Sequence, residues 1–215
     1  MARCMWPRRT PQLFCVATLG AFLISATCDA AGTFFKNQAG GLASPGHTIT
    51  FDGSGLDSST DITDQFSGVS FSPPLRMQPS SQCPTCFGFA GEFVSNIRPG
   101  LLIGWQPVTV QFDSVVSEAA FAMADQQSVW AFEARLGNTL VELAETTIDY
   151  SPGVGFVGFK GIQFDRIILK NFANTVFGID TLQFTSVPEP ATISLALVAI
   201  LVLMHRQRHS SFVIR

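Results

Sequence analysis

Cys83 and Cys86 have the most specific spacing of any reactive side chains in this sequence, in the run Cys83-Pro84-Thr85-Cys86. A zinc site would need two further ligands, and the chain has no second close cysteine pair. A thioredoxin-type redox centre would need the pair at a helix N-terminus within a β-α-β unit, whereas here a loop rich in Ser, Gln and Pro precedes it. In an oxidising compartment, a lone close pair most simply forms a disulfide. The sequence therefore predicts a structural disulfide that clamps this loop.

Carboxylates are the second set of side chains that could do chemistry. Asp52, Asp57, Asp61 and Asp64 gather in a Gly/Ser-rich segment, which could wrap a calcium ion together with backbone carbonyl groups. Their spacing does not match an EF-hand loop. Asp180 is a further candidate, because an inward acid near a strand end needs a partner. We expect either a structural calcium ion held by Asp52, Asp57 and Asp180, or ordinary solvated loop acids.

Catalytic chemistry has little support in the residue types. A glycosidase needs two carboxylates that face one another across a cleft, and nothing in the sequence brings two together. We interpret four glutamates of the strand-rich region as surface residues: Glu118, Glu133, Glu142 and Glu145. The only histidine outside the C-terminal tail is His47, which we interpret as a surface residue before a strand. The sequence predicts a protein that is not an enzyme.

Two tryptophans give a candidate for sugar binding. Trp105 and Trp130 could stack on a pyranose ring if their side chains were exposed. The alternative is that both pack in the core. The many phenylalanines, 20 in the whole chain, are more simply explained as core packing.

The elements that must position these residues are short runs of strand-like sequence. They are separated by turns rich in Gly, Pro, Asn and Ser, a pattern typical of an antiparallel sandwich or barrel. Runs 118–124 and 129–136 are expected to pair across a polar break at 125–128, and a tight hairpin follows at Gly137-Asn138. The expected strands are 48–51, 68–71, 108–112, 118–124, 129–136, 156–162, 166–170 and 177–184. We expect an all-β, antiparallel β-sandwich over residues 31–186.

The N-terminal residues 1–30 are predicted to be a secretory signal peptide. Arg3, Arg8 and Arg9 form a positive region, residues 13–26 form a short apolar region, and small residues follow at a cleavage site. Between the two ends, residues 31–187 hold seven basic and fourteen acidic residues, a net charge of about −7. This charge argues against nucleic acid as a partner.

The C-terminal residues 187–215 have a distinct order of features. Val187 and the tripeptide Pro188-Glu189-Pro190 precede an uncharged run, 191–204, and then a basic cluster. A helix of this run would be about 21 Å long, shorter than the ~30 Å hydrocarbon core of a bilayer. A basic end after such a helix acts as a cytoplasmic stop.

This order of features resembles the PEP-CTERM sorting signal of exopolysaccharide-producing Gram-negative bacteria. In that family a membrane transpeptidase, exosortase, recognises the tripeptide and removes the helix. The resemblance maps Pro188, Glu189 and Pro190 onto the recognised motif, and Arg206 and Arg208 onto the basic end. The helix lacks the glycines common in such signals, and six residues follow the basic cluster. The alternative is a plain C-terminal membrane anchor that is not cleaved.

A second resemblance lies in the body. The segments 48–71 and 159–184 are similar to the opening and the ending of exported jelly-roll modules of the galactose-binding-like or lectin-like class. That resemblance implies the fold better than the function, because such sandwiches host many unrelated activities.

Together these features predict an exported, non-catalytic protein. We expect Sec-type export, an exosortase partner, transient membrane attachment, and a final place at the cell surface or in the exopolysaccharide matrix. A carbohydrate-binding module of the same fold is the alternative. An extracellular glycoside-acting hydrolase is a third hypothesis, which needs a pair of carboxylates in a cleft.

Overall fold

The computed structural model describes residues 32–79, 81, 89, 91–98, 101–102, 106–125, 127–148, 155–173 and 175–188. The described chain is built almost wholly of antiparallel strands, and none of its residues lie in a helix long and apolar enough to cross a membrane. The predicted signal peptide, disulfide, apolar helix and basic end lie outside these ranges. The predicted site residues that lie outside them are Cys83, Cys86, Trp105, Glu189, Pro190, Arg206 and Arg208.

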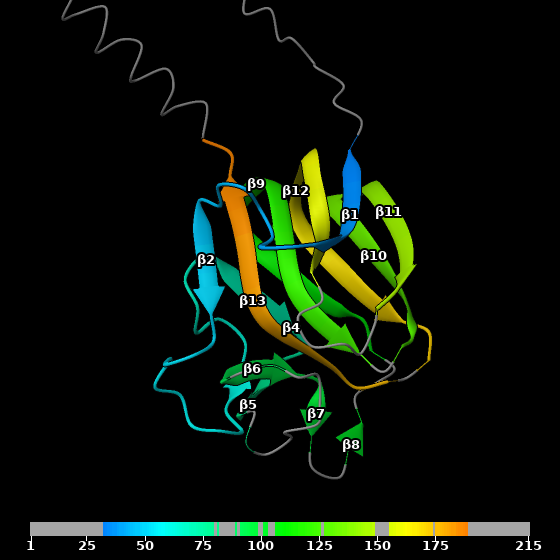
Figure 1. The fold of residues 1–215 in the computed structure, drawn as a ribbon. Helices are drawn as coiled ribbons and strands as arrows, with labels where there is room; N and C mark the ends of the chain where they lie inside the picture. Colours follow the sequence, from blue (N-terminus) through cyan, green and yellow to red (C-terminus); the bar gives the residue numbers. More distant parts are fainter. Residues whose placement is uncertain are drawn as a thin grey trace, which may run out of the picture.

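Thirteen strands make up the described fold (Figure 1). Their bounds are β1 Thr33–Gln38, β2 His47–Thr50, β3 Asp61–Ile62, β4 Val69–Ser72, β5 Leu75–Pro79, β6 Glu92–Ser95, β7 Ile97–Arg98, β8 Leu101–Leu102, β9 Val108–Asp125, β10 Val129–Leu136, β11 Thr139–Thr147, β12 Phe156–Asn171 and β13 Phe177–Ser186. Each of the eight expected strands lies within one of these or extends one residue beyond its end, but 108–112 and 118–124 are both parts of β9, and 156–162 and 166–170 are both parts of β12. The expected hairpin is confirmed, because β10 and β11 pair across Gly137 and Asn138.

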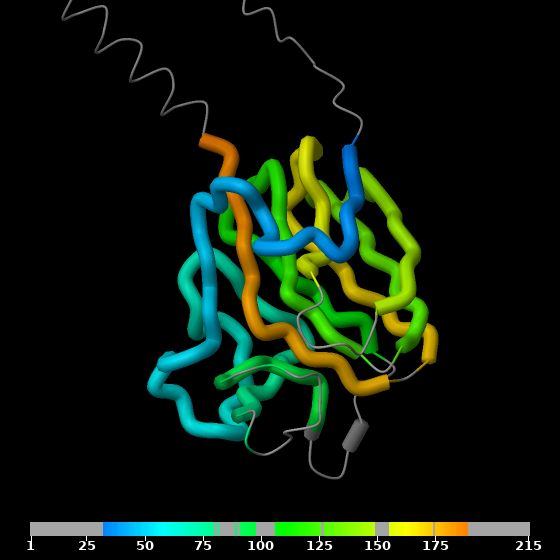
Figure 2. The backbone as a smooth tube through the Cα atoms, in the orientation of Figure 1, coloured from blue at the N-terminus to red at the C-terminus, as the bar shows by residue number. Residues whose placement is uncertain are grey.

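The long strands β9 and β12 form a ribbon that belongs to two layers. They pair along almost their whole length, from Val157 opposite Phe121 to Leu169 opposite Val108. One half of the ribbon lies in the strand order β4-β9-β12-β10-β11. The other half lies in the order β2-β13-β9-β12-β1. Figure 2 shows the ribbon bending between the layers, which gives the antiparallel β-sandwich that the sequence predicts.

One expected pairing is wrong. Residues 118–124 and 129–136 do not pair with each other, because β12 lies between β9 and β10 in the sheet. The expectation treated residues 118–124 as a separate short strand, whereas β9 runs for 18 residues from Val108 to Asp125. One edge of β9 is filled by β12 along most of its length, so β10 pairs with the far edge of β12 instead.

Aromatic rings fill the space between the two layers. Phe34 of β1 contacts Phe132 of β10 with ring centroids 5.4 Å apart, and Phe112 of β9 lies 5.2 Å from Phe184 of β13. Phe112, Phe132 and Phe184 are buried in one continuous hydrophobic cluster, and the partly buried Phe34 packs against it. Each such side chain stabilises the fold by roughly 1.5–3 kcal/mol when it is fully buried. The interpretation of the phenylalanines as core packing is confirmed for most of those that the structure describes, whereas Phe172 is 63% exposed.

Candidate functional site

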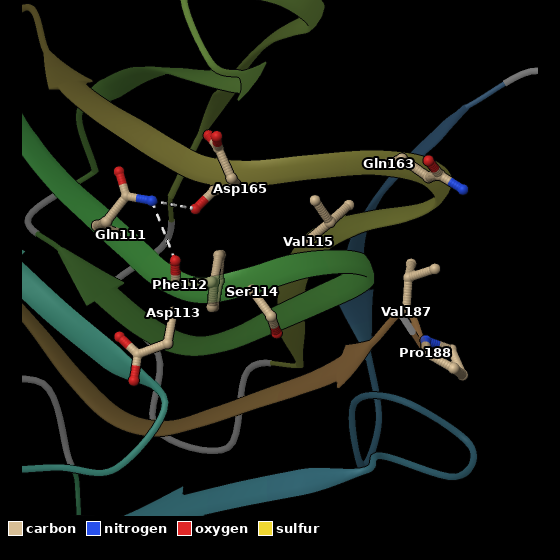
Figure 3. A pocket seen from close by; sticks show the side chains of 9 residues that line it. All are labelled: Gln111, Phe112, Asp113, Ser114, Val115, Gln163, Asp165, Val187 and Pro188. Carbon is tan, nitrogen blue, oxygen red and sulfur yellow. Dashed lines mark hydrogen bonds between the residues drawn. The ribbon is translucent and has the colours of Figure 1, made fainter. Parts of the chain in front are cut away.

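A pocket of about 590 Å³ lies where the β9–β12 ribbon bends, beside the point where the chain leaves β13 (Figure 3). Its polar lining comes from Gln111, Asp113 and Ser114 of β9 and from Gln163 and Asp165 of β12. Its apolar lining is Phe112, Val115, Val187 and Pro188. The pocket therefore combines segments that are about 50 to 75 residues apart in the sequence.

The bend opens because the two strands lose their regular register at this point. The pairing shifts between Lys160 and Phe164 and again between Phe164 and Arg166. Such bulges increase the local bend and leave residues without a cross-strand partner. The irregular stretch begins at Gly161, whose φ of 76° is a backbone conformation that residues other than glycine rarely adopt.

Hydrogen bonds hold the polar lining in place. The Gln111 amide Nε2 donates to the carbonyl oxygen of Phe112 at 3.0 Å and to that of Asp165 at 2.9 Å, so it ties β9 to β12. Ser114 and Ser186 lie with their hydroxyl oxygens 3.0 Å apart. The Val187 N–H donates to the Val115 carbonyl at 2.8 Å, which keeps the chain against the pocket after β13 ends.

The two carboxylates of the pocket are not equivalent. Asp165 accepts a hydrogen bond from the Gly137 N–H at 2.8 Å through Oδ2, and its Oδ1 lies 3.4 Å from Nε of Arg166. Asp113 is exposed, and only its backbone N–H makes a described hydrogen bond. Asp165 is therefore held by its neighbours, whereas the Asp113 carboxylate makes no described hydrogen bond and can accept one from a ligand.

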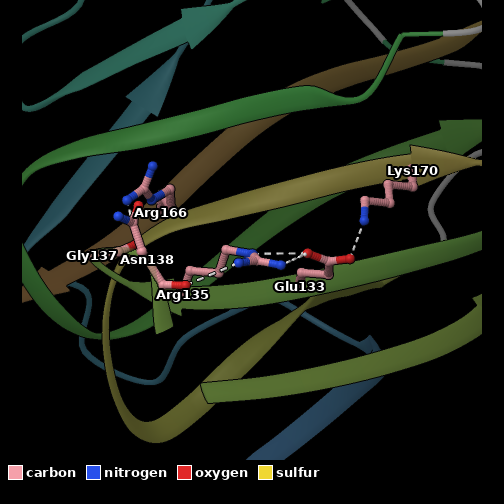
Figure 4. A network of polar contacts seen from close by, with 6 residues as sticks. All are labelled: Glu133, Arg135, Gly137, Asn138, Arg166 and Lys170. Carbon is pink, nitrogen blue, oxygen red and sulfur yellow. Dashed lines mark hydrogen bonds and ion pairs between the residues drawn. The ribbon is translucent and has the colours of Figure 1, made fainter. Parts of the chain in front are cut away.

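A line of charged groups continues from the pocket across β12 and β10 (Figure 4). Arg166 donates to the carbonyl of Gly137, and Arg135 donates to Glu133 Oε2 at 2.9 and 2.7 Å. Lys170 bonds the other oxygen of Glu133. Burial alone would raise the pKa of Glu133, but the hydrogen bonds and charges of Lys170 and Arg135 outweigh it and hold this pKa below its usual value. Glu133 is therefore an ionised, paired group at neutral pH.

This placement corrects the interpretation of Glu133 as a surface acid. The residue is only 7% exposed. It does point away from the aromatic core, as its alternation with Phe132 and Ala134 indicates, but Arg135 and Lys170 cover it. Long basic side chains can bury a neighbouring acid on the outer face of a sheet, and strand alternation alone does not reveal this.

Trp130 is not available for stacking on a sugar. Its side chain is 1% exposed and packs edge-on against Phe177, with centroids 4.9 Å apart. Its Nε1 donates to Asp125 Oδ2 at 2.8 Å, so both its apolar and its polar parts are occupied inside the fold. The hypothesis of an exposed Trp130 is wrong, and the alternative of core packing holds for this residue.

The expected calcium ligands are only partly brought together. Burial of the Asp180 side chain is the main reason that its pKa is raised to about 6, and the negative charge of nearby Asp52 adds to this effect. Asp52 also accepts a hydrogen bond from the Glu92 N–H. Among the residues with described positions, no three acids, histidines or cysteines form a group that could hold a metal ion, so Asp57 does not complete the expected set.

The remaining predicted residues have simple positions. His47 is exposed at the start of β2, as expected, and stacks on Phe184 with centroids 4.8 Å apart. Pro188, the first residue of the sorting motif, is exposed at the rim of the pocket.

Sequence reasoning missed the pocket lining and the buried Asp125. Gln111, Asp113, Gln163 and Asp165 carry no spacing signal, because only the bend brings them together. A signal for Asp125 did exist. It begins a polar run directly after six residues that are all Ala, Phe or Met, where an acid must either reach water or find hydrogen-bond donors.

Comparison with known proteins gives only distant likenesses, since no family model and no curated protein matches the chain. A family two carbohydrate esterase from Cellvibrio japonicus is 12% identical, over 66% of this chain and 36% of that chain, with a TM-score of 0.36. A variant of a family 29 carbohydrate-binding module is 16% identical, over 74% of this chain and 98% of that chain, with a TM-score of 0.29. The chain thus spans about a third of the length of the esterase chain. At these identities and TM-scores, neither likeness assigns an activity to this chain.

Proposed function

We propose that this chain is an exported, non-catalytic protein of the cell surface or exopolysaccharide matrix, and that its β-sandwich binds polysaccharide in the pocket at the β9–β12 bend. The proposal of polysaccharide binding rests mainly on the lining of that pocket by amide, hydroxyl and carboxylate groups. Such groups donate to and accept from sugar hydroxyl groups. Phe112 is 2% exposed and the other apolar linings are aliphatic, so recognition rests on hydrogen bonds rather than on ring stacking.

The non-catalytic part of the proposal follows from the same groups. The Asp165 carboxylate is engaged by Gly137 and Arg166, which leaves Asp113 without a second free acid. No histidine or cysteine lines the pocket. We propose that the body belongs to the galactose-binding-like jelly-roll class, as the sequence resemblance implies.

The sorting part of the proposal rests on the sequence of the tail. We propose that residues 1–30 direct Sec-type export and that residues 187–215 are a PEP-CTERM signal in a Gram-negative bacterium, with an exosortase as partner. The exposure of Pro188 supports this proposal, because a processing enzyme must reach the motif. With an epitope tag after Arg215, the wild-type chain should lose the tag on export. A Glu189→Ala variant should keep it and remain in the membrane fraction. Retention of the tag by both chains would leave a plain anchor as the better explanation.

Polysaccharide binding can be tested by co-sedimentation of the purified protein with the exopolysaccharide of its host. The test variant carries Asp113→Ala and Gln163→Ala, two exposed pocket residues whose side chains make no described hydrogen bond. The control carries Asp64→Ala and Ser58→Ala, which remove one exposed acid and one exposed polar side chain away from the pocket. We expect the test variant to lose at least about tenfold in affinity, or about 1.4 kcal/mol.

The outcomes separate the hypotheses. Equal binding by both variants would move the site away from this pocket, and no binding by the wild-type protein would contradict the carbohydrate proposal. Release of reducing sugar that depends on Asp113 would favour the hydrolase hypothesis instead. Melting curves with and without calcium test the expectation of a structural calcium ion. A rise in the melting temperature of the wild-type protein, absent in an Asp180→Asn variant, would support that expectation, whereas no rise would agree with the incomplete set of acids found in the structure.

A further inference from the structure

Glu142 of β11 points toward the interior of the sandwich rather than toward solvent. It pairs with Ala134, which is fully buried on the core side of β10, and residues directly opposite in an antiparallel pair share a face. Two residues further along β11, Ala144 packs against the hydrophobic core. The Glu142 side chain is therefore half-buried on the inner side of the strand, whereas Glu145 of the same strand is exposed.

The Glu142 carboxylate has no cation to balance it within the described chain. No residue with a described position donates a hydrogen bond to it or forms an ion pair with it. The basic side chains of β1, β10 and β12 are engaged elsewhere: Lys36 with Thr147, Arg135 with Glu133 and Asn138, Lys160 with the Phe35 ring, Arg166 with Gly137, and Lys170 with Glu133. A carboxylate that is partly removed from water without a partner is unfavourable, so this position calls for a cation.

The carboxylate lies against Gly32, the residue directly before β1. Figure 1 shows β1 beside β11, although the two strands belong to different layers. A Cβ added to Gly32 would clash with Oε2 of Glu142 and with Cγ2 of Ile162 on β12. Because glycine has no side chain, the backbone of the chain can approach this carboxylate closely.

The predicted signal peptide ends two residues before this contact. Cleavage after residue 30 makes Ala31 the first residue of the exported chain and gives it a free α-amino group. This group is mostly protonated at neutral pH, because the usual pKa of an α-amino group is about 8. One peptide unit joins Ala31 to Gly32, and consecutive Cα atoms are about 3.8 Å apart. The new ammonium group is therefore within reach of Glu142.

We propose that signal-peptide cleavage supplies the partner that Glu142 lacks: the α-ammonium group of Ala31 forms an ion pair with this carboxylate and fastens the start of β1 to β11. The inference rests on the export part of the proposed function. In the precursor, an uncharged amide joins residue 31 to residue 30, so the ion pair exists only in the processed chain. β1 carries Phe34, whose ring contacts the rings of two buried phenylalanines. Processing therefore strengthens the closure of the core at this edge of the sandwich.

Zero-length cross-linking of the exported chain, purified in detergent, tests the contact directly. Mass spectrometry first establishes whether the chain begins at Ala31. A carbodiimide then activates carboxylates, and an amine in contact with one displaces the urea and forms an amide, with net loss of water. The Ala31 amine should couple to Glu142, and this product should disappear in Glu142→Gln. Glu145→Gln is the matched control and should leave the product unchanged, because Glu145 lies on the same strand but is exposed.

The reactivity of the Ala31 amine measures the ion pair without cross-linking. A carboxylate in contact raises the pKa of an amine by about one unit, which lowers the unprotonated, reactive fraction about tenfold at pH 7. The amine should therefore be acetylated about tenfold faster in Glu142→Gln than in the wild-type chain or in Glu145→Gln. Acetylation removes the charge, so it should lower the melting temperature of the wild-type chain by about 2–4 °C. It should not lower that of Glu142→Gln.

The possible failures are distinguishable. If the chain begins at Ala31 but its amine couples equally to Glu145, or reacts at the same rate in Glu142→Gln as in the wild type, the ion pair is overturned while export stands. An exported chain that keeps residues 1–30 would overturn the cleavage on which the ion pair depends. None of these results involves polysaccharide, so they leave the proposed binding pocket to its own test.

Discussion

Replacement of Asp125 by alanine should cost the protein a large part of its stability. Asp125 ends β9 as a fully buried carboxylate and accepts hydrogen bonds from Ser128, Trp130 and Thr175. These donors lie at the start of β10 and just before β13. The carboxylate therefore fixes the ends of three strands that are not all neighbours in the sheet.

The size of this loss of stability depends on which hydrogen-bond donors to Asp125 can find new partners in the variant. The Ser128 and Thr175 hydroxyl oxygens lie 2.8 Å apart, so these two groups can bond each other when the carboxylate is gone. The Ser128 N–H and the Trp130 Nε1–H have no such replacement, and each buried donor left unpaired costs about 1–3 kcal/mol. Together with the space left by the carboxylate, Asp125→Ala should lower the free energy of unfolding by about 3–5 kcal/mol. Asp125→Asn keeps one acceptor oxygen and should lower it by about 2 kcal/mol.

Urea unfolding followed by circular dichroism measures these differences. Asp113→Ala is the matched control, because Asp113 is also on β9 but its side chain is exposed, and its effect should stay within about 0.5 kcal/mol. If Asp125→Ala and Asp113→Ala differed by less than about 1 kcal/mol, the argument from unpaired donors would be refuted.

Three further changes test other parts of the fold. Glu133→Gln should lower the free energy of unfolding by about 2–3 kcal/mol at neutral pH. The pKa of Glu133 is depressed, so this difference should shrink as the pH falls below about 4, which denaturation at several pH values can check. Asp180→Asn should raise the free energy of unfolding by about 1 kcal/mol at pH 7, allowing for solvent screening. The raised pKa of Asp180 makes wild-type stability fall as the pH rises from about 4 to about 6, and the variant should lack this loss in a pH series of melting curves. Gly158→Ala should cost about 2–3 kcal/mol in the same assay, because its Cβ would meet the backbone carbonyl oxygen of Ala119 on β9.

Local patterns in the sequence were enough to find β2, β4 and β10, and parts of the long strands β9, β12 and β13, but no strand was expected at β1, β3, β5, β6, β7 or β8. The run 129–136 is rich in apolar and aromatic residues and ends at Gly137-Asn138, so both β10 and its hairpin could be predicted. Strand alternation also held the answer for Trp130. It has the same parity as Phe132 and Ala134, and all three face the core. The hypothesis of an exposed Trp130 gave weight to residue type where the parity of the strand was the better guide.

The candidate site could not be predicted, because it arises from the path of the ribbon. Nothing local distinguishes residues 108–112 and 118–124 as two halves of one strand, since the bend between them is set by pairing with β12. The sequence therefore predicted two short strands and a false pairing with 129–136. Gln111 and Asp165 become neighbours only when the bulged register of β12 brings them together.

The position of the pocket links the proposed binding to the proposed sorting. Val187 and Pro188 line the pocket, and the predicted apolar helix begins only three residues after Pro188, a reach of about 11 Å at most. A retained helix would therefore hold the pocket against the membrane surface, where a large polymer has little room to enter. Cleavage at the Pro-Glu-Pro motif would remove that constraint and leave Pro188 at the free rim. We therefore expect that polysaccharide binding requires processing of the tail, so the sorting signal would control when the pocket becomes accessible as well as where the protein goes.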